Sequence, residues 1–331
     1  MVSTIRNRAL NRIPAGIKFE QSTPLENQVG GLSHRQVLKV APIYILKPLH
    51  ADHRGVREVA FYEFVKHAVE QSFGSTPNHL CPKTFRSRQN SQYDKPISEM
   101  EMLRLHREVE LLRRLSSFLP FYYGIFGGDN SSPISHSYLV LEDVTNRFQK
   151  PCVMDLKVGT QTYEPDADPA KILREKNKYP LQSVFGVRIV GMRLNYPTFE
   201  GWHHKIYDKH FGFSLESHES LVSAFGMFLG KDCNRIAIEF IDQLKGILEW
   251  FKVNDAFYFI SSSLLLVYER DSDNRLTSIP SKPIIRMIDL AHVRAKNELD
   301  MGYLTGLQTL ENILLHFAVN SGLCIFNDIP N

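Results

Sequence analysis

The sequence predicts an α+β fold of two lobes that share a cleft. Its 331 residues are enough for about two domains of ordinary size, or for one bilobal unit. Strand-like and helix-like segments alternate along the chain, which is typical of a mixed architecture. Hydrophobic residues make up 43% of the chain and charged residues 23%, so disorder, collagen and coiled coil are excluded.

The N-terminal lobe and hinge are expected to span residues 26–145, after a flexible segment at 1–25. A Gly-Gly turn signal precedes two short apolar runs, which predict a small antiparallel sheet. Apolar residues three and four positions apart then predict helices on this sheet, and a polar, proline-containing stretch at 74–97 predicts an inserted loop. In chain order, we expect strands at 36–40 and 43–46, helices at 55–70 and 98–118, and strands at 122–126 and 137–141.

The C-terminal lobe is expected at residues 146–320, followed by a tail at 321–331. Asp168 and Pro169 form a strong helix start, because Asp caps a helix N-terminus and Pro suits the first helical position. Pro180 is a credible stop for this short basic helix. Farther along, we expect a helix at 232–254, strands at 257–269 and 283–293, and a last helix at 303–319.

Charge and cysteine content exclude several classes of protein. With 39 Lys and Arg against 36 Asp and Glu, the net charge of +3 is too small to indicate a nucleic-acid binder. The four cysteines lie far apart without a C-x-x-C pair, so neither a disulfide scaffold nor a zinc ribbon fits, and an intracellular location in nucleus or cytoplasm is expected. No apolar run approaches the ~20 residues that cross a bilayer.

Residues 151–159 carry the most informative chemical pattern. The two-residue period of a strand sends Asp155 and Lys157 to one face and the apolar residues 152, 154, 156 and 158 to the other. An exposed ion pair would contribute only ~0–1 kcal/mol, so stability explains the pair poorly. A carboxylate that orients a hydroxyl, beside an ammonium that meets a phosphate, indicates phosphoryl transfer, with a scaffold pair as the alternative.

Two further segments suggest anion and metal binding. Lys171, Arg174 and Lys178 fall at i, i+3 and i+7 of the basic helix and could meet one multiply phosphorylated ligand, although a solvated helix face is the simpler explanation. Asp289 follows an apolar strand, where a carboxylate is a natural magnesium ligand for nucleotide phosphates. His292 follows three residues later and could act with it, although a histidine taken alone is more often packed or hydrogen-bonded than in contact with a ligand.

These segments together resemble the inositol polyphosphate kinase family. Its motif P-x-x-x-D-x-K-x-G is matched in full from Pro151 to Gly159, and further family marks occur at 28–31, 262–265 and 288–292, so the resemblance covers roughly residues 26–318. Within the family the chain is most similar to the multikinases, through residues 54–58, 141–145, 178–181 and 191–193. The hexakisphosphate kinases are the nearest alternative, through residues 28–31 and 186–188.

The resemblance implies a protein-kinase-like fold, shared with SAICAR synthase, with ATP in the interlobe cleft and an inositol-binding segment at 163–181. It implies an intracellular, monomeric enzyme that uses ATP and Mg²⁺ or Mn²⁺ to phosphorylate hydroxyls of inositol tris- and tetrakisphosphates. Phosphatidylinositol phosphates are an open alternative substrate. The rival functions are a hexakisphosphate kinase that makes pyrophosphates and a non-catalytic phosphoinositide-binding adaptor.

The same resemblance assigns roles on the nucleotide side of the cleft. Lys47, at the end of a strand, would hold the ATP phosphates, and Glu58, in the first turn of the next helix, would pair with it. Asp155 would lie between nucleotide and acceptor, and Asp289 would bind magnesium, helped by Ser262 or Ser263. The hinge whose backbone meets adenine would consist of Glu142, Asp143 and Val144.

On the acceptor side, Lys157 would touch both the acceptor and the transferred phosphate. Basic substrate-contacting positions of the multikinases are matched by Lys171, Lys178, Arg193 and His292. The chain departs from them at Arg174, Glu175 and Lys209, where multikinases tend to have glutamines, so the choice of acceptor is open.

Overall fold

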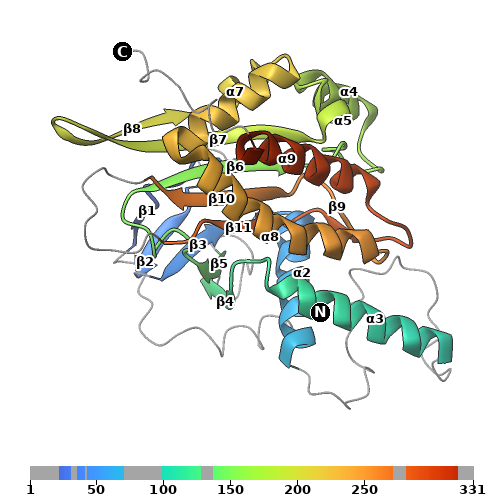
Figure 1. Ribbon diagram of the computed structural model, residues 1–331. Coiled ribbons are helices and arrows are strands. Elements are labelled where there is room, and N and C mark those ends of the chain that lie inside the picture. The colour runs from blue at the N-terminus through green and yellow to red at the C-terminus, as the bar shows by residue number, and fades with distance from the viewer. Residues whose placement is uncertain are drawn as a thin grey trace.

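Two five-stranded antiparallel sheets, one in each lobe, form the frame of this computed structural model (Figure 1). The structure describes residues 22–30, 36–41, 43–70, 99–127, 137–270 and 281–319. The expected insertion at 74–97, the expected tail at 321–331 and residues 1–21 of the expected N-terminal segment lie outside these ranges. The α+β, two-lobed fold class is confirmed.

The N-terminal sheet has the strand order β1-β2-β3-β5-β4. The middle strand of this order, β3, carries Lys47. Its antiparallel register with β5 places Lys47 opposite Leu139. Helix α3 follows the predicted apolar periodicity, whereas the predicted amphipathic pattern was wrong for α2, which is buried on all sides from Glu58 to Val65. The elements are β1 (Thr23–Pro24), β2 (Leu38–Ala41), β3 (Tyr44–Pro48), α2 (His53–Glu70), α3 (Glu99–Ser116), β4 (Tyr122–Gly127) and β5 (Ser137–Glu142).

The C-terminal sheet has the order β11-β10-β6-β7-β8, and α8 and α9 lie across one of its faces (Figure 1). A two-stranded sheet, β12-β9, stands beside it. The elements are β6 (Pro151–Val158), α4 (Pro169–Lys178), α5 (Gln182–Phe185), β7 (Val187–Thr198), β8 (Gly201–Tyr207), α6 (Lys209–Phe213), α7 (His218–Leu229), η3 (Gly230–Asp232), α8 (Cys233–Val253), β9 (Phe257–Phe259), β10 (Ser263–Glu269), β11 (Ile284–Ile288), β12 (Val293–Ala295) and α9 (Met301–Val319).

The central strand β6 shows the alternation that the sequence predicts. Cys152, Met154, Leu156 and Val158 are completely buried in the main core. Asp155 and Lys157 project from the opposite face, where both line a cavity. Burial of the apolar face therefore fixes the direction of the two polar side chains, since a one-residue slip would exchange the faces.

Two predicted strands were wrong as continuous elements. The strand expected at 257–269 is divided into β9 and β10 at Ser261, and the strand expected at 283–293 is divided into β11 and β12 at Asp289. Both residues have left-handed backbone conformations, with φ of 58° and 62°, which a strand cannot contain. The pattern also assigned no element to residues 182–231, where the structure has β7, β8, the helices α5, α6 and α7, and the start of η3.

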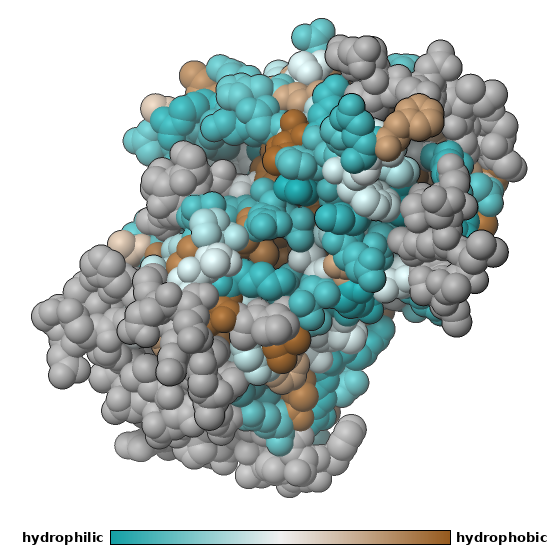
Figure 2. Space-filling view, turned by 90° about the vertical axis from the view of Figure 1, so that its left-hand side faces the viewer, coloured by the Kyte–Doolittle hydropathy of each residue, from teal (hydrophilic) through white to brown (hydrophobic). Residues whose placement is uncertain are grey.

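The face in Figure 2 is mainly hydrophilic, with smaller hydrophobic patches between the polar side chains. None of the described helices combines the length and the apolar character that crossing a bilayer requires.

Candidate active site

A cavity of about 300 Å³ opens between the lobes. The N-terminal sheet contributes apolar Val37 and Ile45, and the C-terminal sheet contributes Val153 and Leu265. Charged side chains gather at the other end of the cavity, so it has an apolar part and an ionic part, as a nucleotide requires. Apart from Glu142 and Asp143, the Lys, His, Asp and Glu residues of the lining are Lys47, His50, Glu58, Asp155, Lys157, Asp289 and His292.

Lys47 is held between two carboxylates from different lobes. Its Nζ lies 2.6 Å from Oε1 of Glu58 on α2 and 2.6 Å from Oδ1 of Asp289 after β11. Although burial opposes it, the charges of Asp289 and Glu58 raise the pKa of Lys47 far above its ordinary value. Lys47 and Lys157 likewise hold the pKa of Asp289 below its ordinary value against the effect of burial. The side chains of Lys47 and Asp289 are therefore both charged at neutral pH.

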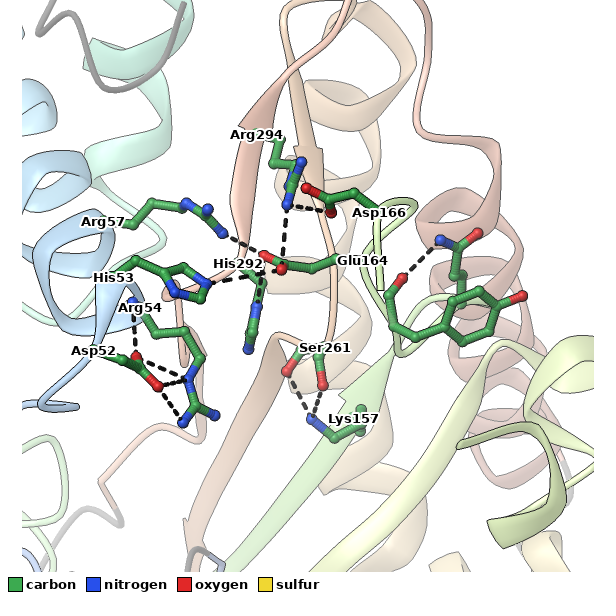
Figure 3. Close-up of polar contacts among 12 residues, drawn as sticks. Asp52, His53, Arg54, Arg57, Lys157, Glu164, Asp166, Ser261, His292 and Arg294 are labelled. Carbon is green, nitrogen blue, oxygen red and sulfur yellow. Dashed lines mark hydrogen bonds and ion pairs between the residues drawn. The ribbon is translucent and has the colours of Figure 1, made fainter. Parts of the chain in front are cut away.

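Asp155 and Lys157 lie side by side at the same cavity. Asp155 is only 5% exposed, and among the described residues its Oδ1 has no hydrogen-bond partner. Burial, together with the charge of Asp289, raises the pKa of Asp155 to about 6. Lys157 Nζ donates to the backbone oxygen of Ser261 at 2.6 Å and to its Oγ at 2.9 Å (Figure 3).

Two glycines bring an N-terminal segment down onto Asp155. A Cβ atom at Gly30 would lie 2.0 Å from Oδ2 of Asp155, and one at Gly191 would lie 1.7 Å from the backbone oxygen of Val29. Gln28 fixes the segment, because its side chain donates to the Gly30 oxygen and accepts from the Val37 amide. These glycines permit the close approach of backbone to strand.

Gly191→Ala is therefore expected to displace residues 28–30 from the cavity. The new methyl group would meet backbone, which cannot rotate away as a flexible side chain can. We expect the KM for the nucleotide to rise at least about fivefold, a cost of ~1 kcal/mol. Steady-state kinetics with varied nucleotide would measure this, and an unchanged KM would show that the segment does not shape the nucleotide site.

The hinge residues Glu142, Asp143 and Val144 line the cavity, but the carboxylates of the first two are engaged elsewhere. Glu142 Oε2 accepts from the Phe121 amide at 3.1 Å. Asp143 accepts from the amide and hydroxyl of Thr145 and pairs with Lys39 at 2.9 Å. The backbone amides of Glu142 and Asp143 are also engaged, because they donate to the oxygens of Phe121 and Ile43 at 2.9 Å.

Ser262 and Ser263, the serines expected to help Asp289 bind magnesium, do not line the cavity. Ser262 is completely buried and its Oγ donates to the Tyr303 hydroxyl at 3.4 Å, away from the cavity. Ser263 is also buried and does not line the cavity, although its Oγ has no hydrogen-bond partner in the described part of the chain. The serine at the cavity is Ser261, which the sequence reasoning missed although it belongs to the same run of three.

Most expected acceptor-binding cations lie outside the cavity. Helix α4 begins as predicted, with Asp168 Oδ1 accepting from the Ala170 amide at 2.8 Å. Arg174 and Lys209 are exposed, and Lys178 pairs with Glu175. The remaining expected positions are Lys171, which is partly exposed on α4, Arg193, which donates to the Glu26 oxygen at 2.9 Å, and His292, which lines the cavity.

Glu164 is a further buried charge that the sequence reasoning missed. Its Oε1 accepts from Arg57 and, at 3.0 Å, from Nδ1 of His292, while its Oε2 lies 3.2 Å from Arg294 (Figure 3). Although burial opposes it, hydrogen bonds from His292 and Arg57 and the charge of Arg294 lower the pKa of Glu164 to about 2. An isolated Tyr-Glu-Pro sequence gives no signal of such a cluster.

The donor set fits a nucleotide with one divalent cation. In the described ranges no group of three His, Cys, Asp or Glu side chains is arranged to hold a metal unaided. Mg²⁺ commonly needs only one or two carboxylates, because phosphates and water complete its shell. Asp289, partly exposed at 44%, and the unpaired Oδ1 of Asp155 supply such oxygens, and Lys47 and Lys157 supply charge for phosphates.

Comparison with known proteins gives a consistent result. A family model described as inositol polyphosphate kinase matches residues 138–315. Human inositol polyphosphate multikinase is 34% identical over 206 residues, which are 61% of this chain and 45% of that protein. The rat multikinase is 30% identical over 263 residues, which are 77% of this chain and 55% of that protein. The chain thus spans about half the length of these curated relatives.

One solved structure shows the same fold. The crystal structure of the inositol phosphate multikinase Ipk2 from S. cerevisiae, in complex with ADP and Mn²⁺, matches with a TM-score of 0.55. The match covers 83% of this chain and 99% of that chain at 20% sequence identity. At this identity the likeness establishes the two-lobed architecture only.

Proposed function

This chain belongs to the inositol polyphosphate kinase family, and from that premise we propose that it transfers the γ-phosphate of ATP to hydroxyls of inositol tris- and tetrakisphosphates. The observation that carries the proposal is the meeting of Lys47, Asp155, Lys157 and Asp289 at one cavity. Two cations and two carboxylates from both lobes suit a reaction in which positioning and charge supply most of the acceleration.

The nucleotide would occupy the apolar part of the cavity. Adenine would lie between Val37 and Ile45 on one side and Leu265 on the other, with the hinge backbone at its edge. Lys47 would bind the phosphates, and Asp289 would hold Mg²⁺ or Mn²⁺. When bound, the metal would neutralise the charge of the phosphate oxygens.

Asp155 is well suited to orient the acceptor. Its Oδ1 is unpaired, and its pKa of about 6 leaves it ionised but basic at neutral pH. The acceptor hydroxyl would give its proton to Asp155 as its oxygen bonds to the γ-phosphorus. The bond from that phosphorus to the bridging oxygen of ADP would break at the same time, and Lys157 would stabilise the transferred phosphate.

The acceptor would lie beside Lys157, toward the segment 163–181. Burial lowers the pKa of Lys157 most, but the charges of Arg188 on β7 and Glu175 on α4 also act on it. Helix α4 is therefore close enough to place charge at the acceptor. We propose that Lys171, Arg174, Lys178, Arg193 and Lys209 supply the positive field there, with Arg174 and Lys209 reaching the acceptor from exposed positions, and that His292 contacts the acceptor.

The test is to supply ATP and Mg²⁺ with inositol tris-, tetrakis- and hexakisphosphates separately, and to resolve the products. We expect tris- and tetrakisphosphates to be phosphorylated, and Lys157→Ala to lower kcat about 10²-fold because a charge at the transferred phosphate is lost. Lys252→Ala, on an exposed part of α8, is the matched control. Vesicles containing phosphatidylinositol phosphates extend the panel to the lipid alternative.

The outcomes separate the rival functions. A diphosphate product from the hexakisphosphate would favour a hexakisphosphate kinase. No turnover of any acceptor would favour a phosphoinositide-binding adaptor. Full activity of Lys157→Ala would refute the assignment of the site.

A further inference from the structure

Glu164 connects three separate parts of the chain beside the cavity. Arg57 comes from α2 in the N-terminal lobe, Arg294 comes from β12, and His292 comes from the turn before it. Arg57 and His292 donate to one carboxylate that is 8% exposed, and Arg294 forms an ion pair with its Oε2 at 3.2 Å. His53 of α2 lies 4.0 Å from the same Oε2 (Figure 3). The segment that leads into α4 is thereby bound to both lobes at one point.

The cluster is too costly to be incidental. The side chain of Glu164 is 10% exposed, and those of Arg57 and Arg294 are 19% and 29% exposed, so removal of the carboxylate would leave two partly buried cations with less compensation. Apart from Glu164, the carboxylate that contacts Arg294 is Asp166, which is 68% exposed. Glu164 and Asp166 together balance the charges of Arg57 and Arg294, so the cluster acts on an anion through the position that it gives His292.

His292 is the member of the cluster that lines the cavity. Its Nδ1 is 3.0 Å from Glu164, which leaves Nε2 as the ring nitrogen available to a ligand. A carboxylate on one nitrogen fixes both the tautomer and the orientation of an imidazole, as it does for metal-bound histidines.

We propose that Glu164 is a positioning residue for the acceptor: it fixes His292 with Nε2 toward the cavity and ties the acceptor-binding segment to both lobes. This rests on the proposed function, since the acceptor is the anion concerned. Glu164 does not touch the reacting atoms and acts through His292 and Arg57. It stays ionised throughout the working pH range because its pKa is about 2.

The first test compares Glu164→Gln with Asp166→Asn. Both substitutions remove one carboxylate that contacts Arg294, but only the first removes the carboxylate that holds His292 and Arg57. We expect Glu164→Gln to raise the KM for the inositol trisphosphate at least tenfold and the KM for ATP less than twofold. Asp166→Asn should change both values less than twofold, and Glu164→Asp, which keeps the charge, should recover part of the loss. An equal rise of both KM values in Glu164→Gln, or no rise, would overturn the proposal.

The second test needs no turnover. Long-range ¹H–¹⁵N NMR of the parent protein should show His292 with its Nδ1 protonated at every pH. Burial lowers the pKa of His292, Arg54 and Arg57 lower it further, and Glu164 opposes this. In Glu164→Gln, with nucleotide binding as the check of folding, the pKa of His292 should fall further.

The NMR result also separates this inference from the proposed function. A neutral His292 protonated on Nε2 in the parent would overturn the inference even if every acceptor is phosphorylated. Failure of the parent to turn over any acceptor, with the Nδ1 tautomer present, would overturn the proposed function and leave the role of Glu164 in holding His292 supported.

Discussion

Asp289→Asn is expected to lower kcat about 10³-fold while the protein stays folded. The substitution removes the charge that we assign to the metal but keeps the size of the side chain. Asparagine also tolerates the left-handed backbone at this position, where φ is 62°. Lys47 keeps its second partner, because Glu58 lies 2.6 Å from the same Nζ.

Two measurements check this prediction. Turnover of inositol trisphosphate at saturating ATP and Mg²⁺ gives kcat, and thermal unfolding gives stability. Asp242→Asn, on an exposed part of α8 where the side chain is 69% exposed, is the matched control and should keep full activity. If Asp289→Asn retained more than a tenth of the parent kcat, Asp289 would not be the residue that holds the metal.

Local patterns of the sequence predicted the parts of the site that depend on one element. The alternation in β6 placed Asp155 and Lys157 together because strand geometry and burial of four apolar neighbours act within eight residues. The start of α4 was predicted for the same reason, since Asp168 caps the helix that it precedes. In β6, burial of the apolar face was sufficient to determine the direction of Asp155 and Lys157.

Features that depend on tertiary structure could not be predicted in this way. The backbone of Asp289 has a left-handed conformation, with φ of 62°. The sequence around Asp289 continues the apolar run of a strand and does not indicate this conformation. Glu164 receives its hydrogen bonds from residues 107 and 128 positions away, so no local window contains the cluster. On α4, periodicity placed Arg174 with the other cations, but it could not determine which helix face turns toward the sheet.

Asp155→Asn is expected to reduce kcat about 10³-fold and yet to stabilise the protein. Burial and the Asp289 charge raise the pKa of Asp155 from 3.8 to about 6, a net shift that already includes its attraction to Lys157 and Lys47. The ionised side chain therefore costs folding free energy at neutral pH, roughly 2–3 kcal/mol from the size of the shift. Asparagine removes this charge and keeps the shape.

The dependence of protein stability on pH shows whether ionisation of Asp155 stabilises or destabilises the fold. Between pH 3.8 and about 6 the folded protein binds the Asp155 proton more tightly than the unfolded chain does, so this group makes the protein less stable as pH rises through that window. The free energy of unfolding of Asp155→Asn, measured in urea, should match the parent near pH 4 and exceed it above pH 6. If the variant were less stable than the parent at pH 7, or if the difference in unfolding free energy did not change with pH, the ionised form of Asp155 would not destabilise the folded protein.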